Sequence, residues 1–498
     1  MATSTAAAEE ARQGGTPSRR VLPAAGSPLW LVAVAAVFAL AQLALVAPRL
    51  GLSWDEIVSV SQFSAHAPAS AFGPPRARGV SLLVAPVALL TSSVVALRVY
   101  LAILSGLGLF LAMLVWSRIR PAWMVALGGV FFASLWVSLY YGPQAMPDFW
   151  VALSVLAAVG FFLQAAGEAL PGAVATPRGA LAGLAGSLAL AALIRPGDAV
   201  FLAVGLTLAI VTMRSWRRWS LFAATAIGLL AGSAEWIIEA FVRFGGPLER
   251  LRGAGQEQGG LGLHAGFWDQ LRAVNGPTLC RPCLGAVRSP GLSLWWLVLP
   301  VVVVLGILAA RQAGRLRSAL LAAVCAGFVG FQYLFMIDYA APRFLLPVYA
   351  LLAIPVADAL AWLVTGVSAR TRPLTTALVA VVLLAQVVTQ QVVLSRQIAA
   401  KVSFFGDYAQ IAADLHHLGV RSPCVVNGVQ EIPIAFYAGC GSAATIPAAL
   451  RAGHVAADRV AVLVPPATSP PGYARNWRRV TLPGLRNRAL VLVAYLPR

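Results

Sequence analysis

Long apolar runs separated by short arginine-rich linkers dominate this sequence. The chain of 498 residues is 59% hydrophobic and only 11% charged, whereas soluble domains carry about 25% charged residues. Eleven runs approach the ~20 residues that cross a bilayer: Leu29–Val46, Val94–Trp116, Ala122–Tyr141, Phe149–Gln164, Ala180–Ile194, Ala199–Met213, Leu221–Phe241, Leu292–Ala310, Ala319–Ile337, Phe344–Val364 and Thr375–Leu394. The pattern predicts an α-helical polytopic membrane protein.

The linkers between the runs test this topology. With a cytoplasmic N-terminus, eleven crossings place every short basic linker in the cytoplasm, as the positive-inside rule requires: Arg118 and Arg120, Arg178, Arg214 with Arg217 and Arg218, Arg311 with Arg315 and Arg317, and Arg370 with Arg372. The net charge of +19 is then an orientation signal, so we expect no nucleic-acid partner.

Two segments decide whether this count holds. The runs around Arg195-Pro196-Gly197-Asp198 must cross separately, although they could also form one broken or re-entrant element. The shorter apolar run Val80–Leu90 must not cross, and we interpret it as a helix in the outer interface.

The chain divides into three predicted parts. Residues 1–27 form a cytoplasmic leader, of which Met1–Arg20 is expected to be disordered, and 28–394 form the transmembrane domain, with outer loops at 48–93 and 243–290. Residues 395–498 form a small extracytoplasmic α/β domain. Within it we expect a helix at Tyr408–Leu418, strands at Pro423–Val426, Val460–Val464 and Leu490–Tyr495, and a turn or helix at Ile432–Tyr437.

The cysteines are divided between the membrane and the outer side. Cys325 lies within a span and is expected to be a core residue. Cys424 and Cys440 flank one strand–helix unit on the oxidising side, where a disulfide can form. For Cys280-Arg281-Pro282-Cys283 a local disulfide or two free thiols is favoured over a zinc site, which lacks enough further ligands.

Carboxylates mark the outward ends of two spans. Asp55 and Glu56, in Trp54-Asp55-Glu56, follow the first span, and Asp148 opens the fourth behind Tyr140-Tyr141. An ionised group so close to a bilayer is a site hypothesis. Each could instead be an acid at a helix N-terminus, where the helix dipole favours negative charge. Two acidic positions at one membrane face favour a shared pocket.

Several arginines break the positive-inside pattern because they lie outside. Arg76, Arg78 and Arg343 are candidates to bind an anion, since the guanidinium fork suits phosphate, and Arg98 is a weaker candidate. Snorkelling to lipid phosphates is the alternative. A last pair of acids, Glu235 and Glu239, either lines the cavity or pairs with Arg243.

These features, taken in order, resemble the GT-C glycosyltransferases, in particular the branch with protein O-mannosyltransferases and lipid A aminoarabinose transferases. The resemblance covers about residues 28–365 and implies a bacterial, and within bacteria an actinobacterial, member. One departure is Gly73, where many relatives have histidine before the Pro-Pro pair. The matching elements are Trp54-Asp55-Glu56, Gly73-Pro74-Pro75, Ala96-Leu97-Arg98, Tyr140-Tyr141 with Pro147-Asp148, Arg195-Pro196 and Arg343-Phe344-Leu345-Leu346-Pro347.

The resemblance implies an inverting transfer of a sugar from a polyprenyl-phosphate donor to an acceptor hydroxyl on the outer face of the cell membrane. The acceptor would be a protein, lipid or glycan of the cell envelope, and membrane lipid is a further partner. Asp55 would act as general base, assisted by Glu56 or Asp148, and its pKa is expected to be raised near the apolar boundary. Arg76, Arg78 and Arg343 would stabilise the leaving phosphate, and Trp54 and Tyr141 would contact substrate. No cofactor is required, although a divalent cation, Mg or Mn, is compatible.

Two other functions use the same features. A transporter or flippase for a lipid-linked sugar would need the cavity and the arginines without chemistry. A non-catalytic accessory protein would use the tail to bind cell-wall components.

Overall fold

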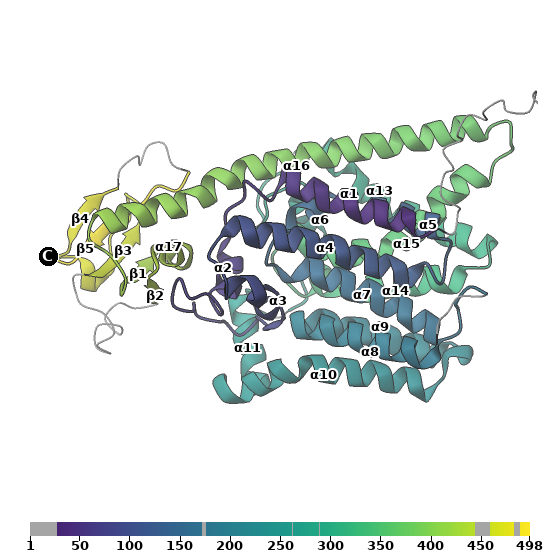
Figure 1. The fold of residues 1–498 in the computed structure, drawn as a ribbon, viewed down its shortest axis with the longest axis horizontal. Helices are drawn as coiled ribbons and strands as arrows, with labels where there is room; N and C mark the ends of the chain where they lie inside the picture. Colours follow the sequence, from purple (N-terminus) through teal and green to yellow (C-terminus); the bar gives the residue numbers. More distant parts are fainter. Residues whose placement is uncertain (1–26, 172–175, 261, 288, 444–458, 483–488) are drawn as a thin grey trace, which may run out of the picture.

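A computed structural model describes residues 27–171, 176–260, 262–287, 289–443, 459–482 and 489–498 of the chain. The predicted disordered leader Met1–Arg20 lies outside the described residues. The described part is a bundle of long helices with a small sheet domain at one end (Figure 1).

Eight helices of the described part are long and apolar enough to cross a bilayer, and each coincides with a predicted span. They are α4 (Val94–Trp116), α7 (Pro147–Ala165), α8 (Pro177–Ile194), α10 (Trp219–Arg243), α13 (Pro290–Gln312), α14 (Leu316–Phe335), the pair η3 (Pro342–Leu345) and α15 (Leu346–Thr365), and α16 (Arg372–His417). Two of the other predicted spans are the shorter apolar helices α1 (Leu29–Leu45) and α9 (Pro196–Thr212).

The remaining predicted span, Ala122–Tyr141, is two helices and not one. α5 (Ala122–Ser134) ends where Leu135 becomes extended, and α6 (Trp136–Tyr141) begins directly afterwards. The break frees the backbone N–H of Trp136, which donates to Gln390 Oε1 of α16 at 2.9 Å. A side chain from a distant helix therefore satisfies the break, which hydropathy alone does not indicate.

The two runs around Arg195 form separate helices, as predicted. α8 ends at Ile194, Arg195 is extended, and Pro196 starts α9, where its fixed φ and missing N–H are tolerated. α8 packs against α9 as well as against α7 and α10. Following the helices in order puts all the arginine-rich linkers at the end of the bundle opposite the sheet domain, which is the one-sided distribution that the positive-inside argument requires.

The end of the bundle nearest the sheet domain carries the loops, and we call it the loop end. It holds α2 (Trp54–Val60), α3 (Gly79–Ala88), α11 (Pro247–Glu257) and α12 (Phe267–Ala273) (Figure 1). α3 is the helix predicted at Val80–Leu90. The long loop between α10 and α13 is thus partly helical, and α11 is tied down by Arg250, which donates to Pro74 O and Arg76 O.

The tail contains a mixed five-stranded sheet of order β2-β1-β3-β5-β4. β1 is parallel to β2 and β3, whereas β5 is antiparallel to β3 and β4. Predicted strands match β1, β3 and β5, and the segment left open as a turn or helix is α17. The elements are β1 (Val425–Gly428), α17 (Glu431–Ala438), β2 (Gly441–Ser442), β3 (Val460–Val464), β4 (Arg478–Thr481) and β5 (Val493–Leu496).

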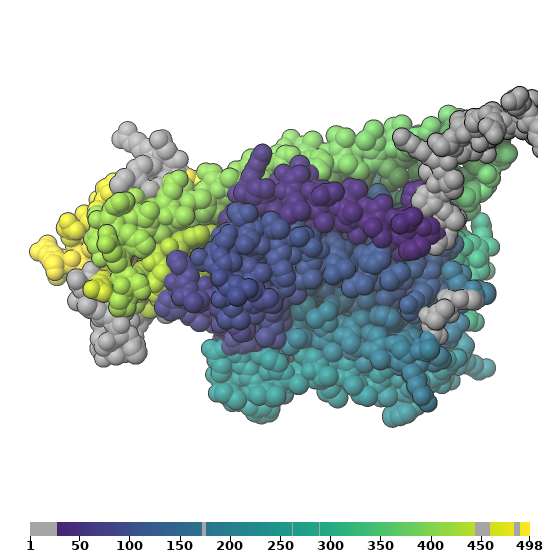
Figure 2. Space-filling model, in the orientation of Figure 1, coloured from purple at the N-terminus to yellow at the C-terminus, as the bar shows by residue number. Residues whose placement is uncertain are grey.

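The predicted separation of the last span from a tail helix at Tyr408–Leu418 is wrong. α16 runs without interruption for 46 residues and includes both segments. The polar residues after Leu394 mark the end of the apolar part, but the stretch contains no proline, and its single glycine, Gly406, is accommodated within the helix. The tail also contacts the first loop: Tyr437 OH accepts from Leu52 N at 3.1 Å, and Figure 2 shows the sheet domain (yellow-green) against that loop (purple-blue).

Close helix contacts depend on small residues, as is common in membrane bundles. A Cβ on Gly306 of α13 would lie 1.8 Å from Pro355 O of α15, whereas a Cβ on Gly327 of α14 would meet nothing within 4 Å. We predict that Gly306→Ala lowers the thermal unfolding midpoint in detergent, because overpacking costs about 1–3 kcal/mol. Gly327→Ala is the matched control and should unfold at or above the wild-type temperature, and equal midpoints for both variants would contradict this packing.

Candidate active site

The two acids that begin α2 have different surroundings. Ser53 caps the helix, and Glu56 completes a capping box, because its Oε2 accepts from Ser53 N and Ser53 Oγ, both at 2.9 Å. Glu56 is fully buried, where it pairs with the equally buried Arg98. Successive side chains of a helix point about 100° apart, so Asp55 projects elsewhere, with 35% of its side chain exposed.

Asp55 is held between two arginines. Arg76 Nη2 donates to Asp55 Oδ1 at 2.7 Å, and Arg343 Nη2 donates to Asp55 Oδ2 at 3.3 Å. Arg343 also reaches the second predicted acidic position, since its Nε lies 3.2 Å from Asp148 Oδ2. Asp55 and Asp148 therefore belong to one charged cluster through Arg343, but the predicted shared pocket is not found, because Asp148 lines neither of the cavities that the described residues form at this site.

Arg195 extends this cluster on the other side of Asp148. It pairs with Asp148 Oδ1 and lies 3.8 Å from Asp198 Oδ2. Its guanidinium also stacks 5.2 Å from the ring centroid of Tyr333, whose hydroxyl donates to Asp198 at 2.6 Å. Arg195 is thus fixed by ion pairs and an aromatic face together.

The chain folds this way because four helix starts converge. Asp55 and Asp148 lie in the first turns of α2 and α7, a position that favours carboxylates. Arg195 lies in the turn between α8 and α9, and Arg343 lies in η3, just before α15. Each of these residues adjoins a proline or a cap, so the local sequence fixes the helix start and the bundle brings the starts together.

Burial alone would raise the pKa of the Asp55 carboxyl. The positive charges of Arg76 and Arg343 outweigh that effect, and the pKa of Asp55 is lowered from its ordinary value. The predicted rise in pKa is therefore wrong, because two guanidinium groups that are distant in sequence adjoin this carboxylate.

Two cavities meet at Asp55. The first, of about 260 Å³, has arginines at its wall, and we call it the arginine cavity; among its lining residues are Asp55, Arg76, Arg195, Arg281, Arg343 and Glu257. The second, of about 290 Å³, is lined by rings, and we call it the aromatic cavity; it includes Trp54, Asp55, Tyr140, Tyr141, Arg343, Lys401, Phe404, Phe405, Tyr408 and Gln430. Asp55 and Arg343 line both, so this carboxylate is accessible from either side.

Of the other predicted site residues, some line a cavity and some do not. Trp54 and Tyr141 line the aromatic cavity, whereas Glu56, Asp148 and Arg78 line neither cavity. Arg78 Nη2 instead donates to Glu239 at 2.6 Å. Glu239 also pairs with Arg243, which settles the alternative left open for that acid.

Sequence reasoning missed several lining residues. Arg195 is quoted as part of a motif but is not assigned to the site, although an arginine between two spans at the outer face is the same signal as Arg343. Glu257 lies against Gly73, where a Cβ would come within 2.9 Å of its carboxylate. Tyr408 and Gln430 come from the tail, and no local pattern connects them with the membrane domain.

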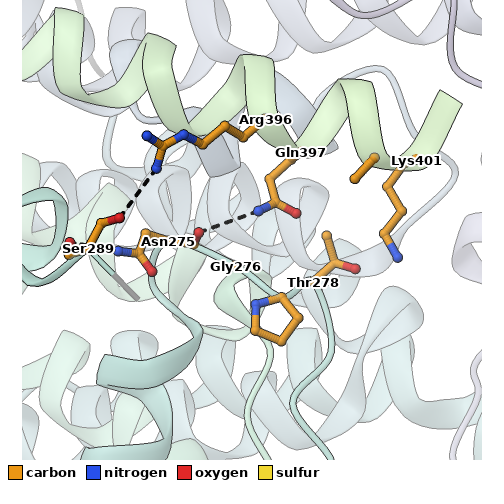
Figure 3. A pocket seen from close by; sticks show the side chains of 9 residues that line it. Asn275, Gly276, Thr278, Ser289, Arg396, Gln397 and Lys401 are labelled. Carbon is orange, nitrogen blue, oxygen red and sulfur yellow. Dashed lines mark hydrogen bonds between the residues drawn. The ribbon is translucent and has the colours of Figure 1, made fainter. Parts of the chain in front are cut away.

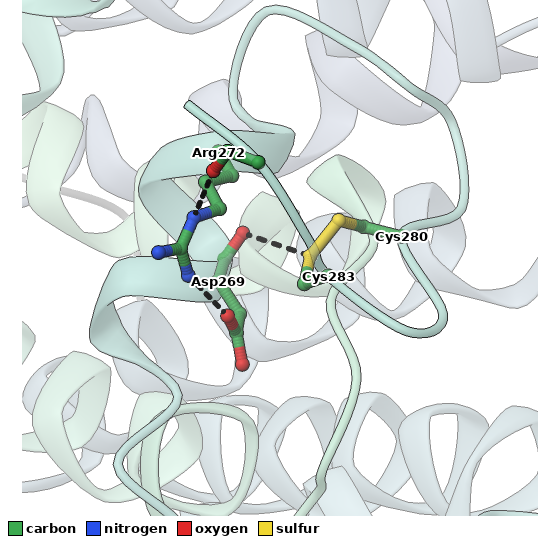
Figure 4. Close-up of a disulfide and its surroundings, with 5 residues drawn as sticks. Asp269, Arg272, Cys280 and Cys283 are labelled. Carbon is green, nitrogen blue, oxygen red and sulfur yellow. Dashed lines mark hydrogen bonds and ion pairs between the residues drawn. A yellow bond between two sulfur atoms is a disulfide. The ribbon is translucent and has the colours of Figure 1, made fainter. Parts of the chain in front are cut away.

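The Cys-Arg-Pro-Cys loop forms part of the wall of the arginine cavity. Cys280 and Cys283 form a disulfide (Figure 4), so the zinc alternative for this pair is wrong. Cys424 and Cys440 are also bonded. Arg281, which lies between the two cysteines in the sequence, stacks over the Tyr339 ring at 5.0 Å and donates to Glu257 O at 2.9 Å. Leu279 and Arg281 both line the arginine cavity. The disulfide thus shapes a wall of the site.

The described residues do not suit a divalent cation. They include no group of three or more His, Cys, Asp or Glu side chains that could hold a metal. Asp55 and Asp148 each face two guanidinium groups. A cation at either carboxylate would adjoin like charge, and we derive no step through a metal.

The fold of most of the chain is similar to that of solved membrane glycosyltransferases. ArnT from Cupriavidus metallidurans bound to undecaprenyl phosphate matches with a TM-score of 0.64 and 14% identity, over 94% of this chain and 98% of that chain. Its apo state matches with a TM-score of 0.59 and 16% identity, over 94% and 97%. The apo oligosaccharyltransferase of Archaeoglobus fulgidus matches with a TM-score of 0.51 and 14% identity, over 83% of this chain and 64% of that chain.

At these identities the likeness establishes the fold. The chain has a GT-C-like fold of membrane helices with a small C-terminal sheet domain, as predicted. No protein-family model matches the chain, and no curated protein sequence matches it.

The different surroundings of Asp55 and Glu56 lead to a stability prediction. Glu56→Ala leaves the Arg98 guanidinium buried without its counter-ion, and removing one partner of a buried pair costs about 3–5 kcal/mol. Asp55→Asn should change stability little, because its side chain and that of Arg76 are part-exposed. Thermal unfolding of both variants in detergent checks this, and a larger loss for Asp55→Asn would refute the assignment of Glu56 as the structural acid.

Proposed function

We propose that this protein is an inverting glycosyltransferase that moves a sugar from a polyprenyl-phosphate carrier to an acceptor hydroxyl at the outer face of the cell membrane. The observation that carries the proposal is the position of Asp55, a carboxylate held by two arginines where the arginine and aromatic cavities meet. The fold supports it, because a similar protein was solved bound to undecaprenyl phosphate.

The donor would bind on the side of the arginine cavity. Arg76, Arg195, Arg281 and Arg343 offer guanidinium forks, which bind phosphate oxygens in pairs. An apolar groove of about 510 Å³ lies along α4, α7 and α8, a surface that suits a polyprenyl tail. Val80 lines the arginine cavity and Leu83 lines the groove, and residues three apart on a helix are neighbours. Head group and tail would therefore lie one helical turn apart.

The acceptor would approach through the aromatic cavity. Asp55 accepts the proton of the acceptor hydroxyl while that oxygen bonds to the anomeric carbon of the sugar. The bond between this carbon and the phosphate oxygen breaks, and the lipid phosphate leaves with the electron pair, stabilised by the arginines. A single base and a displacement from the opposite face produce inversion, without a second carboxylate as nucleophile.

A low pKa in the free protein is compatible with this role. The carboxylate is ionised and ready to accept a proton, and the acceptor oxygen becomes much more acidic as it bonds to carbon. The donor phosphate would also share Arg76 and Arg343 with Asp55. Because part of their charge would then be directed to the phosphate, the basicity of Asp55 would rise when the donor binds.

The remaining residues, predicted as catalytic or substrate-binding, would position the site or contact the substrates. Glu56 fixes the start of α2 through Ser53 and Arg98, and Asp148 holds Arg343 and Arg195 side by side. Arg78 fixes the loop before α3 to Glu239. Trp54 and Tyr141 would offer ring faces to the bound sugar or acceptor.

The first test is transfer of radiolabel from a panel of polyprenyl-phosphate sugars to a crude membrane acceptor fraction. We expect purified wild-type protein in lipid to transfer label. The Asp55→Asn variant should transfer it about 10²–10⁴-fold more slowly, which is the usual contribution of a general base. Glu249→Gln, an exposed acid on α11, is the control and should retain the rate. Binding of the lipid phosphate that persists in Asp55→Asn, without transfer by the wild type from any donor, would favour the transporter or accessory alternatives.

The pH dependence of the rate tests whether the charge of Arg76 lowers the pKa of Asp55. A base acts while it is deprotonated, so the rate should fall as pH drops through the pKa of Asp55, which the arginines lower. Arg76→Gln removes one positive charge, raises this pKa, and should move the acidic limb of the pH–rate profile toward higher pH. A limb that stays in place in Arg76→Gln would show that another group titrates there.

A further inference from the structure

A polar cavity lies beside the aromatic cavity, between α16 and the loop that follows α12. Its volume is about 330 Å³, and Figure 3 shows Arg396, Gln397 and Lys401 projecting toward it from one side of α16. The opposite wall is backbone and small polar side chains. The lining residues are Asn275, Gly276, Pro277, Thr278, Ser289, Arg396, Gln397, Ala400 and Lys401.

The lining of this cavity carries positive charge and no carboxylate. At the loop end, Arg76, Arg78 and Arg343 are each paired with an acid. Within the described part of the chain, neither Arg396 nor Lys401 has such an ion pair. Among the described residues, Arg396 donates to Ser289 Oγ at 3.4 Å, and Lys401 lies over the rings of Phe404 and Phe405. Neither cation has a carboxylate of the described residues as its counter-ion, so both can pair with an anion.

The polar cavity adjoins the aromatic cavity, and the two share lining residues. Thr278 and Lys401 line both this cavity and the aromatic cavity, and Lys401 Nζ lies 5.4 Å from the ring centroid of Phe404. The aromatic cavity in turn reaches Asp55. A molecule that extends along α16 would therefore have one end at the cations and the other at the carboxylate.

The distance of Lys401 from the end of the apolar run argues against a lipid headgroup as the anion that binds in this cavity. Lys401 lies seven residues beyond Leu394, the end of the apolar run, which corresponds to about 10 Å along a helix. The headgroup layer of one leaflet is only about 5–8 Å thick. Counted from the end of the apolar run, Arg396 would lie at headgroup level and Lys401 above it.

We propose that this cavity binds an anionic group, a phosphate or a carboxylate, of the acceptor. The acceptor of the transfer is then an acidic molecule that lies along α16 and presents a hydroxyl to Asp55. This assignment rests on the proposed glycosyl transfer, whereas binding of an anion at Lys401 can be measured without turnover.

Lys401 is the only lysine of the chain, so its amine can be followed selectively. Protein in phosphatidylcholine nanodiscs is acetylated with the uncharged N-hydroxysuccinimidyl acetate, and mass spectrometry measures the rate at Lys401 and at the N-terminal amine. We expect glucose 6-phosphate and glucuronate to slow the reaction at Lys401 at least twofold, and glucose at matched ionic strength to have no effect. The N-terminus should not respond to any of the three sugars.

Further measurements with variants and with anionic lipid distinguish a soluble sugar anion from a lipid headgroup as the group bound at Lys401. Arg396→Gln should weaken the protection, whereas Arg421→Gln, an exposed arginine that lines none of these cavities, should not. Nanodiscs with phosphatidylglycerol should leave protection by sugar phosphate in place. Protection by phosphatidylglycerol alone, with no further effect of the sugars, would assign the cavity to lipid headgroups and overturn the proposal, as would equal protection by glucose.

The transfer assay then tests the acceptor role. Lys401→Gln should raise KM for the acceptor about tenfold or more, the loss expected for a hydrogen bond to a charged group, while KM for the donor stays unchanged and Lys401→Arg restores the acceptor KM. Unchanged acceptor KM in an active enzyme would overturn this inference alone. Absence of transfer by the wild type would refute the proposed function, and the labelling result would then establish or exclude an anion site without an acceptor role.

Discussion

The buried pair of Glu56 and Arg98 determines where the rest of the site lies. Burying two charges is costly unless every polar atom finds a partner, and here the partners are backbone groups of two separate loops. Arg98 donates to Leu50 O, Gly51 O and Pro143 O, and Glu56 accepts from Ala145 N at 2.9 Å. One ion pair thus joins the loop after α1 and the loop before α7 to the start of α4. Asp55 and Asp148, which follow these loops, are placed relative to each other as a consequence.

Beyond this pair, the charges of the cluster alternate in sign. Arg76, Asp55, Arg343, Asp148 and Arg195 follow one another with opposite signs in contact. The guanidinium groups are therefore held in place by the acids, and in the proposed transfer they would need little reorganisation to meet a developing negative charge. Because Asp148 is buried whereas Asp55 is part-exposed, an exchange of ion-pair partners with a donor phosphate would fall on Asp55, the one acid of this series that also lines the aromatic cavity.

Much of this fold could be predicted from the sequence, because apolar length and arginine placement depend on the bilayer and not on tertiary contacts. The acidic positions Asp55 and Asp148 could be predicted for the same reason, since a charge at a membrane boundary is conspicuous. The division of roles between Asp55 and Glu56 could not, because it depends on Arg98, 42 residues away. The break before Trp136 likewise depends on Gln390. Contacts between distant segments decide these features, and no local pattern encodes them.

The continuity of α16 links the tail to the chemistry. Its apolar part packs on α6 and α15 within the bundle, and its polar part supplies Phe404, Phe405 and Tyr408 to the aromatic cavity. Tyr408 also donates to Gln430 Oε1 of the tail at 2.9 Å. The tail and the cavity wall that faces Asp55 are therefore connected by one continuous helix. An acceptor bound by the proposed enzyme in the aromatic cavity would consequently contact the tail, through Gln430, as well as the carboxylate.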